Sequence, residues 1–323
     1  MVKVIEAGNV NEAYILAMAH LREDGAHEDS RNGPVIVAPG PVVTVYARPC
    51  ERVLFSVIRN GNPFFHFMES LWMLAGRNDL AFIQPFVARM AEFSDDGETL
   101  HGAYGKRWRS WFGFDQLSAL VGELQARPES RRAVLEMWSA EDDLVRPGGK
   151  DLPCNTHAYF DLRGGKLNMT VLNRSNDAIW GCYGANVVHF SVMMEYMAAM
   201  LGVGVGEYRQ FSNNLHVRLV VPRVEEMLAC RDVENPYASG GVAPFSLVHE
   251  ASRWDVDLAA FMEAPENAFE TPNLLFPQVA RPMYLAWKSH KAGSHAAALS
   301  HAWEIAATDW RKACVDWLAG RMS

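Results

Sequence analysis

Residues 158–173 read AYFDLRGGKLNMTVLN and carry the clearest structural signal in the chain. Apolar and polar residues alternate on both sides of a central glycine pair, Gly164 and Gly165. Strict alternation is typical of a strand with one buried face, and two glycines supply the positive φ angles of a tight turn. This stretch therefore predicts a β-hairpin with one face in the core.

Around the hairpin the chain alternates between helical and strand patterns. Residues 10–24, 64–76, 114–126 and 186–201 have helical length and composition, and the aromatic-rich residues 281–319 are also expected to be helical. Strands are expected within 41–59, and the polar residues 25–40 are expected to form a loop. A length of 323 residues favours about two domains, but no repeat, low-complexity segment or linker divides the chain. We therefore expect one α/β (α+β) domain over residues 1–323.

Composition excludes several classes of protein. Hydrophobic residues make up 49% and charged residues 21%, as in soluble globular chains. A net charge of −8 argues against non-specific nucleic-acid binding, although local arginines can still bind a small anion. The 5 cysteines contain no CxxC pair, which argues against a disulfide framework or a structural zinc site. The first residues do not resemble a signal peptide, and no apolar run reaches the ~18 residues of a membrane span, so a reducing cytoplasm is expected.

Cys154 is a candidate nucleophile. It follows Pro153 and stands one residue before the first strand of the hairpin. A thiol at a strand edge becomes reactive where cations lower its pKa, and the alternative is an inert buried cysteine. Two basic segments, Arg131–Arg132 and Arg174–Ser175, are candidates for binding a phosphate, with plain surface charge as the alternative.

Other chemistry-bearing residues lack the spacing of a known site. His66 and His189 lie on apolar helical stretches and are expected to be core histidines with satisfied hydrogen bonds. His290, His295 and His301 lack metal-ligand spacing, and no metal is expected. The alternating Gly202, Gly204 and Gly206 do not complete a dinucleotide-binding motif.

Short motifs in a fixed order resemble the thymidylate synthase superfamily. In the order of the chain they are SRNGP (30–34), MESLW (68–72), GAYGKRWR (102–109), PESRRAV (128–134), LPCNTH (152–157), NRSND (173–177) and NNLHV (213–217). So many matching blocks in family order are very hard to obtain by chance. The resemblance implies a mixed β-sheet flanked by helices, in a homodimer formed through the sheet.

The resemblance also implies the chemistry of the site. It implies that Cys154 attacks C6 of a pyrimidine nucleoside 5′-monophosphate, that Glu69 and Tyr104 assist proton transfers, and that 5,10-methylenetetrahydrofolate supplies one carbon. Further family roles fall on the following positions: Arg31, Arg174, Arg131 and Arg132 for the phosphate, the last two from the partner subunit; Ser175, His216, Ala185, Asn186 and Arg218 for the rest of the nucleotide; and Asp177, Trp72 and Gly181 for the folate.

Several departures from the synthase pattern resemble the hydroxymethylase branch of the superfamily. Those matched to that branch are Asn176 in NRSND and Leu215 in NNLHV. The other departures are Asn155 after Cys154, Met90 and Phe93 where tryptophans usually stand, Arg218 in place of a tyrosine, and Ala185 at the usual base-reading position with Asn186 one residue later. Fewer tryptophans leave the reaction more open to water, which favours a hydroxymethyl product over a methyl product.

The choice of base is less determined by these positions. The branch resemblance favours CMP or dCMP as the substrate, whereas a dUMP hydroxymethylase or a thymidylate synthase is the alternative. An amide such as that of Asn186 suits uracil but can rotate to serve cytosine. Two other classes are a non-catalytic nucleotide- or messenger-RNA-binding regulator, against which the retained Cys154 and arginines count, and a cysteine hydrolase, for which a histidine partner pattern is lacking.

Overall fold

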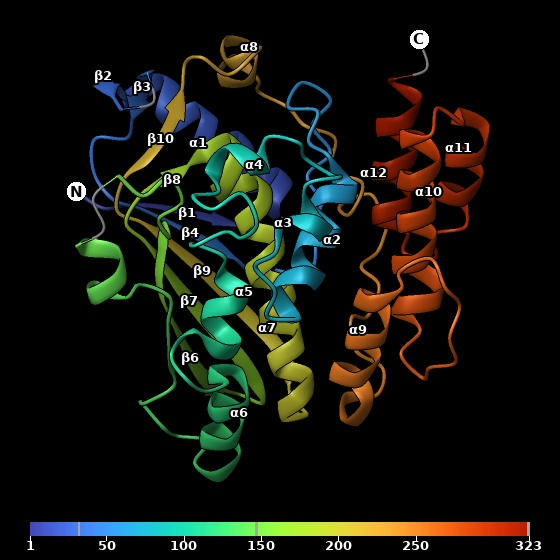
Figure 1. Ribbon diagram of the computed structural model, residues 1–323. Helices are drawn as coiled ribbons and strands as arrows, with labels where there is room; N and C mark the ends of the chain where they lie inside the picture. Colours follow the sequence, from blue (N-terminus) through green and yellow to red (C-terminus); the bar gives the residue numbers. More distant parts are fainter. Residues whose placement is uncertain (32, 146–147, 322–323) are drawn as a thin grey trace.

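A six-stranded mixed sheet forms the centre of the protein (Figure 1). The computed structural model describes residues 1–31, 33–145 and 148–321. Across the sheet the order is β1 (Lys3–Ala7), β4 (Val42–Tyr46), β9 (Gly204–Ser212), β7 (Lys166–Asn173), β6 (Asn155–Arg163) and β5 (Val134–Glu136). The predicted hairpin is confirmed as β6 and β7, and its turn residues Gly164 and Gly165 have φ angles of 56° and 72°.

A second, four-stranded sheet corrects the expected loop at residues 25–40. Its order is β2 (Ala26–Ser30), β3 (Gly33–Val37), β10 (Leu215–Arg218) and β8 (Asn176–Asp177). The β2 strand is exposed along its whole length, so its composition resembles a loop, and its ladder to β3 supplies the pairing. The apolar β3 pairs in turn with β10, far away in the sequence.

Within residues 41–59 the prediction of strands holds only for β4.

The expected helices are confirmed close to their predicted limits. They are α1 (Val10–Asp24), α2 (Pro63–Leu74), α6 (Gln116–Ala126), α7 (Asn186–Leu201), α10 (Arg281–Lys291), α11 (His295–Trp303) and α12 (Thr308–Ala319). Local chemistry explains the ends: the Asn62 side chain caps the first turn of α2 and Pro63 is its first residue, while Gly202 ends α7 with a φ of 69°.

Shorter helical segments connect these elements. They are α3 (Leu80–Ile83), α4 (Met90–Phe93), α5 (Tyr104–Lys106), α8 (Val224–Ala229), α9 (Trp254–Glu263), the 3₁₀ turn η4 (Ala251–Arg253) and the π-helical segments η1 (Arg107–Trp111), η2 (Ala140–Leu144), η3 (Ala178–Ala185) and η5 (Phe276–Ala280).

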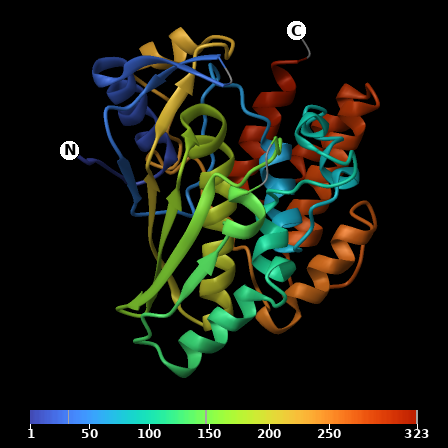
Figure 2. The same cartoon turned by 60° about the vertical axis from the view of Figure 1, so that its left-hand side comes forward.

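The large helices lie on one side of the six-stranded sheet (Figure 2). Helix α7 packs on β7 and β9, α2 packs on α7, and α10 and α12 pack on α2. One continuous cluster of buried apolar side chains joins these layers from α1 to α12. Within the described residues, no helix has the length and apolar character needed to cross a membrane.

Candidate active site

A cavity of about 340 Å³ opens where the two sheets meet α2 and α7. It gathers most of the side chains that the motifs single out, although they are far apart in the sequence. The predicted residues that line it are Arg31, Glu69, Trp72, Tyr104, Cys154, Arg174, Ser175, Asp177, Gly181, Ala185, Asn186, His216 and Arg218. Arg131 and Arg132 are exposed and outside the lining, in the segment that precedes β5.

The thiol of Cys154 stands at the cavity wall, immediately before β6. Its backbone is held in place because the N–H groups of Cys154 and Asn155 both donate to the Tyr104 hydroxyl oxygen, at 3.1 Å each. Burial raises the pKa of Tyr104 well above its usual range, so the hydroxyl stays neutral. Tyr104 therefore acts on the position of the nucleophile as well as facing the cavity.

The cations around Cys154 do not ionise it by themselves, contrary to the sequence-based expectation. Arg174 Nη2 lies 3.9 Å from the sulfur and lowers the thiol pKa, as does the more distant Arg31. Burial raises the pKa by more than these charges lower it, and Asp151 and Asp177 add to the rise. The thiol of the free protein is thus protonated at neutral pH.

Arg31 and Arg174 supply two guanidinium groups on one side of the cavity. The side chain of Arg174 is oriented by the carbonyl oxygens of Pro153, at 2.9 Å, and Leu152, at 3.2 Å. Ser175 follows at the end of β7 and lines the same wall. A guanidinium pair beside a hydroxyl is suited to a phosphate group.

The two residues at the expected base-reading position lie where the π-helical segment η3 meets α7. The segment η3, just before α7, is π-helical and holds one more residue per turn than an α-helix would. Ala185 and Asn186 both line the cavity, and Asn186 carries the amide that Ala185 lacks. Counting from Gly181 along the family pattern gives Ala185, whereas the amide is carried by Asn186, one residue later.

A chain of side-chain hydrogen bonds orients the Asn186 amide. Its Nδ2 donates to Asn176 Oδ1 at 3.1 Å, and Asn176 Nδ2 donates to Ser212 Oγ at 2.9 Å. The Oδ1 of Asn186 and the second hydrogen of its Nδ2 are left to face the cavity. Gly181 allows this approach, because a Cβ there would lie 3.0 Å from Asn176 Oδ1 and 3.1 Å from Asn186 Nδ2.

The carboxylate of Asp177 is already engaged. Its Oδ1 accepts the N–H groups of Ile179 and Trp180, at 2.9 and 2.7 Å, and thereby caps η3. Its Oδ2 accepts Arg218 Nε at 2.8 Å. Arg218 thus holds Asp177 in the free protein, so a folate pterin would have to share this carboxylate with it.

The mouth of the cavity fits a flat aromatic cofactor such as a folate. Trp180 is 44% exposed there and packs against Phe65, with ring centroids 5.8 Å apart. Met90 and Phe93 of α4 line the same opening, and Trp72 lies in the wall. Trp180 also lines the cavity, although the motif comparison did not single it out. The signal in the sequence was its position directly after the NRSND motif, in NRSNDAIWG.

His189 does not behave as a satisfied core histidine, and that prediction is wrong. Its imidazole is 2% exposed, lines the cavity, and places Nε2 3.0 Å from Glu69 Oε2. Both of these atoms nevertheless lack a hydrogen bond of good geometry to any described residue. One helical turn of α7 separates Asn186 from His189, which explains why the two residues face the same space.

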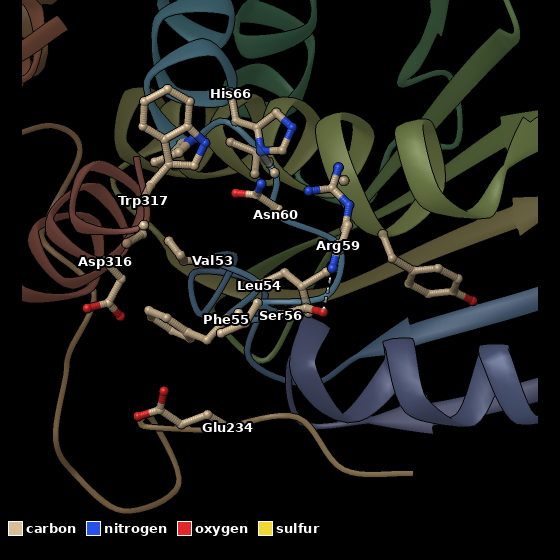
Figure 3. Close-up of a pocket in the computed structure, with 18 of the residues that line it drawn as sticks. Val53, Leu54, Phe55, Ser56, Arg59, Asn60, His66, Glu234, Asp316 and Trp317 are labelled. Carbon is tan, nitrogen blue, oxygen red and sulfur yellow. Dashed lines mark hydrogen bonds between the residues drawn. The ribbon is translucent and has the colours of Figure 1, made fainter. Parts of the chain in front are cut away.

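A second cavity, of about 300 Å³, lies away from these motifs (Figure 3). It is bounded by segments within 52–66, the chain on either side of α8, the junction of η3 with α7, and helix α12, with His66, Arg59 and Trp317 in its wall. None of the predicted site residues lines it. The chemistry therefore concentrates in the first cavity.

Sequence comparison identifies the family. Residues 13–238 match the thymidylate synthase family, and the chain belongs to it. A deoxyuridylate hydroxymethyltransferase of Pseudomonas phage M6 is 46% identical over 99% of this chain and 94% of its own length. A deoxyuridylate hydroxymethyltransferase of Bacillus phage SP01 is 42% identical over 55% of this chain and 49% of its own length. A thymidylate synthase of Symbiobacterium thermophilum is 29% identical over 46% of this chain and 56% of its own length.

These relatives confirm the prediction of a hydroxymethyltransferase within this family. Family membership implies a pyrimidine nucleotide substrate and methylenetetrahydrofolate as the one-carbon donor. Two of these relatives are named for deoxyuridylate and none of the three for a cytidylate, so they support the alternative of a dUMP enzyme better than the expected CMP or dCMP enzyme.

Proposed function

We propose that this protein converts dUMP to 5-hydroxymethyl-dUMP with methylenetetrahydrofolate. The observation that carries the choice of base is the oriented amide of Asn186. With Nδ2 directed to Asn176, Asn186 offers an acceptor for the N3–H of uracil and a second donor hydrogen for O4. Cytosine presents the opposite pattern at both positions and would require the amide chain to turn over. The deoxyuridylate relatives support the same choice.

The site residues divide the work as follows. Arg31 and Arg174 bind the 5′-phosphate, and Ser175 and His216 line the path of the nucleotide. His216 Nδ1 is held at 2.9 Å from Asn214 Oδ1, which fixes its ring. Cys154 adds to C6 as the thiolate, and the extra electron density makes C5 nucleophilic. The thiol and the Arg174 guanidinium are already adjacent before the nucleotide binds, with Nη2 3.9 Å from the sulfur.

The folate supplies a one-carbon unit at the oxidation level of formaldehyde. Trp180, Met90, Phe93 and Trp72 offer the flat apolar walls that would hold its ring, with Asp177 and Gly181 near the opening. Once this carbon is bonded to C5, loss of the C5 proton together with cleavage of the bond from the carbon to the folate nitrogen would release tetrahydrofolate and leave an exocyclic methylene on the nucleotide. Water adding to that carbon gives hydroxymethyl, and hydride transfer to it gives methyl.

The opening favours water. Phe93 is 37% exposed, and Met90 and Phe93 present less planar surface than a pair of tryptophans would. Hydride transfer requires a dry, closed site. The half-open wall at α4 supports the hydroxymethyl product and agrees with the names of the relatives.

We also propose that the working form is a homodimer built through the six-stranded sheet. Neighbouring residues form two rows across all six strands on the face opposite the helices: Val4, Val43, Phe211, Leu172, His157 and Glu136, and then Glu6, Val45, Arg209, Thr170, Tyr159 and Val134. Val4, Tyr159 and Val134 are 52%, 41% and 39% exposed. A second copy would cover this surface and bring its Arg131 and Arg132 to the cavity.

The test presents dUMP, dCMP and CMP separately with methylenetetrahydrofolate. We expect dUMP to react best, its product to gain the mass of CH₂O, and the folate to leave as tetrahydrofolate. Formation of dihydrofolate, seen as a rise in near-ultraviolet absorbance, together with dTMP would identify a thymidylate synthase. A preference for either cytidylate would overturn the assignment of the base.

A further inference from the structure

The Glu69–His189 pair is a polar site inside an otherwise apolar region. Glu69 lies on α2 between Phe65, Met68 and Trp72, and His189 lies on α7. Glu69 is 5% exposed, and α2 packs directly against α7. A carboxylate and an imidazole are costly to bury without hydrogen bonds, so their presence at the cavity wall calls for a partner there.

The partners are missing from the described part of the chain. Glu69 Oε2 and both ring nitrogens of His189 have no hydrogen bond to a described residue, and the indole Nε1 of Trp72, one turn along α2, is in the same condition. All three side chains line the first cavity. Several unsatisfied polar atoms facing one space are the condition under which a protein holds an ordered water molecule.

We infer that Glu69 and His189 together hold the water molecule that attacks the exocyclic methylene, and that His189 takes up its proton. This inference rests on the proposed hydroxymethylation. The water oxygen bonds to the exocyclic carbon, and the electrons of the C5-methylene double bond move onto C4–O4 as an enolate. The enolate then re-forms the C5–C6 double bond and expels the Cys154 thiolate. The proton from water passes through Glu69 to His189 and finally returns to the thiolate.

His189 thereby selects the product. An imidazole beside a carboxylate can take up a proton, because the negative carboxylate balances the positive charge that forms on the ring. A site without the imidazole would hold the water less firmly and would leave the methylene open to hydride. His66, on the same face of α2 as Glu69, lines the other cavity and is not part of this pair.

The test isolates the water step from the folate. The enzyme is incubated with 5-hydroxymethyl-dUMP in oxygen-18 water without folate, and exchange of the hydroxymethyl oxygen is followed by mass spectrometry. Cys154 re-adds to C6, the hydroxyl leaves as water, and labelled water adds back, so no other reactant is needed. We expect wild type to exchange and His189→Ala to exchange about 100-fold more slowly, with the dUMP dissociation constant unchanged and part of the rate restored by added imidazole.

Two further variants make the result specific. His189→Gln keeps the volume and hydrogen-bonding capacity but cannot take up the proton, so it should also be slow. His20→Gln changes a buried histidine of α1 that pairs with Asp24, at 2.8 Å, and should exchange at the wild-type rate.

Wild-type exchange with equally fast His189 variants would overturn the inference and leave the proposed function standing. Loss of dUMP binding in both His189 variants, without rescue by imidazole, would make His189 a structural residue and also overturn it. Absence of both exchange and hydroxymethyl product in wild type would instead refute the proposed function.

Discussion

At the scale of single residues, the site depends on which polar atoms remain free. Asn186 has an acceptor and a donor hydrogen that face the cavity because Asn176 holds its other hydrogen. His189 faces the same cavity because it lies one turn further along α7. Nearby cations lower the pKa of Cys154 and burial raises it, and the effect of burial is the larger.

Replacing the side-chain nitrogen of Asn186 with oxygen should change the preference for the base. In Asn186→Asp, a carboxyl group can accept a hydrogen bond from the cytosine N4 amino group and share a proton with N3. Uracil has the opposite pattern, with a donor at N3 and an acceptor at O4, so it matches this group less well. We expect the ratio of kcat/KM for dCMP over dUMP to rise at least about 100-fold. Steady-state kinetics with both nucleotides measures it.

Asn60→Asp places the same charge in the second cavity and is the matched control. An unchanged ratio in Asn186→Asp would remove Asn186 from base recognition.

The reactivity of Cys154 should depend on pH in a definite direction. Thiolate is the reactive form, and burial raises the folded-state pKa, so alkylation by iodoacetamide should speed up with rising pH, with its midpoint above the ordinary range of a thiol. Arg174→Ala removes a charge that lowers this pKa and should move the midpoint higher. Peptide mass spectrometry follows the alkylation of Cys154 itself. A midpoint near neutral pH in the free protein would contradict the balance of burial over charge.

At the scale of elements, the π-helical segment η3 positions the site. It joins β8 to α7, is capped by Asp177, and passes Gly181 close to the amides of Asn176 and Asn186. The extra residue that the π geometry holds brings Asn186 to the cavity, and α7 then carries His189 to Glu69 on α2. The positions of Asn186 and His189 therefore both depend on one short turn.

The close approach at Gly181 can be tested with a methyl group. Gly181→Ala would place a Cβ 3.0 Å from Asn176 Oδ1, which forces the amide chain to shift. We expect KM for dUMP to rise about tenfold, the effect of a loss of about 1.4 kcal/mol in binding, with a small change in melting temperature.

Gly122→Ala is the control, because nothing lies within 4 Å of a Cβ there and the site is inside α6. This control should leave KM unchanged and stabilise the fold by about 0.5–1 kcal/mol. Equal KM values in wild type and Gly181→Ala would show that the amide chain tolerates displacement.

At the scale of the whole molecule, one face of the large sheet and one arginine pair point to a second copy. The two rows of partly exposed residues, apolar and polar, cross the six-stranded sheet on the face opposite the helices. Arg131 and Arg132 are exposed near the end of this sheet, ahead of the edge strand β5. A symmetric pair that buries these rows would complete two phosphate sites at once.

Mixing two inactive variants tests the shared site. Arg132→Ala lacks a donated arginine and Cys154→Ala lacks the nucleophile, and in a hybrid dimer one of the two sites has both residues. After subunit exchange, random mixing should restore about one quarter of the wild-type activity, because half of the dimers are hybrids with one complete site. Activity that stays absent after exchange has been verified by mass spectrometry would refute the shared site.

Local patterns in the sequence were sufficient for the hairpin and the long helices, and the family resemblance selected Cys154 as the candidate nucleophile. Alternation, glycine pairs, caps and apolar periodicity act over a few residues, so the ends of α1, α2 and α7 follow from neighbouring side chains. The ordered motifs likewise determined the family and most of the cavity lining, because each motif is a short segment with its own chemistry.

Tertiary structure alone decided the remaining features, since they depend on contacts between distant segments. The strands β2 and β3 exist as part of a sheet because β10 pairs with β3, about 180 residues later in the chain. Ala185 has no amide side chain, and the amide at the cavity belongs to Asn186, which follows the π-helical segment η3. Burial, which no local pattern measures, raises the pKa of Cys154. The packing of α2 against α7 places Glu69 beside His189, and Glu69 Oε2 and both His189 ring nitrogens have no hydrogen-bond partner among the described residues.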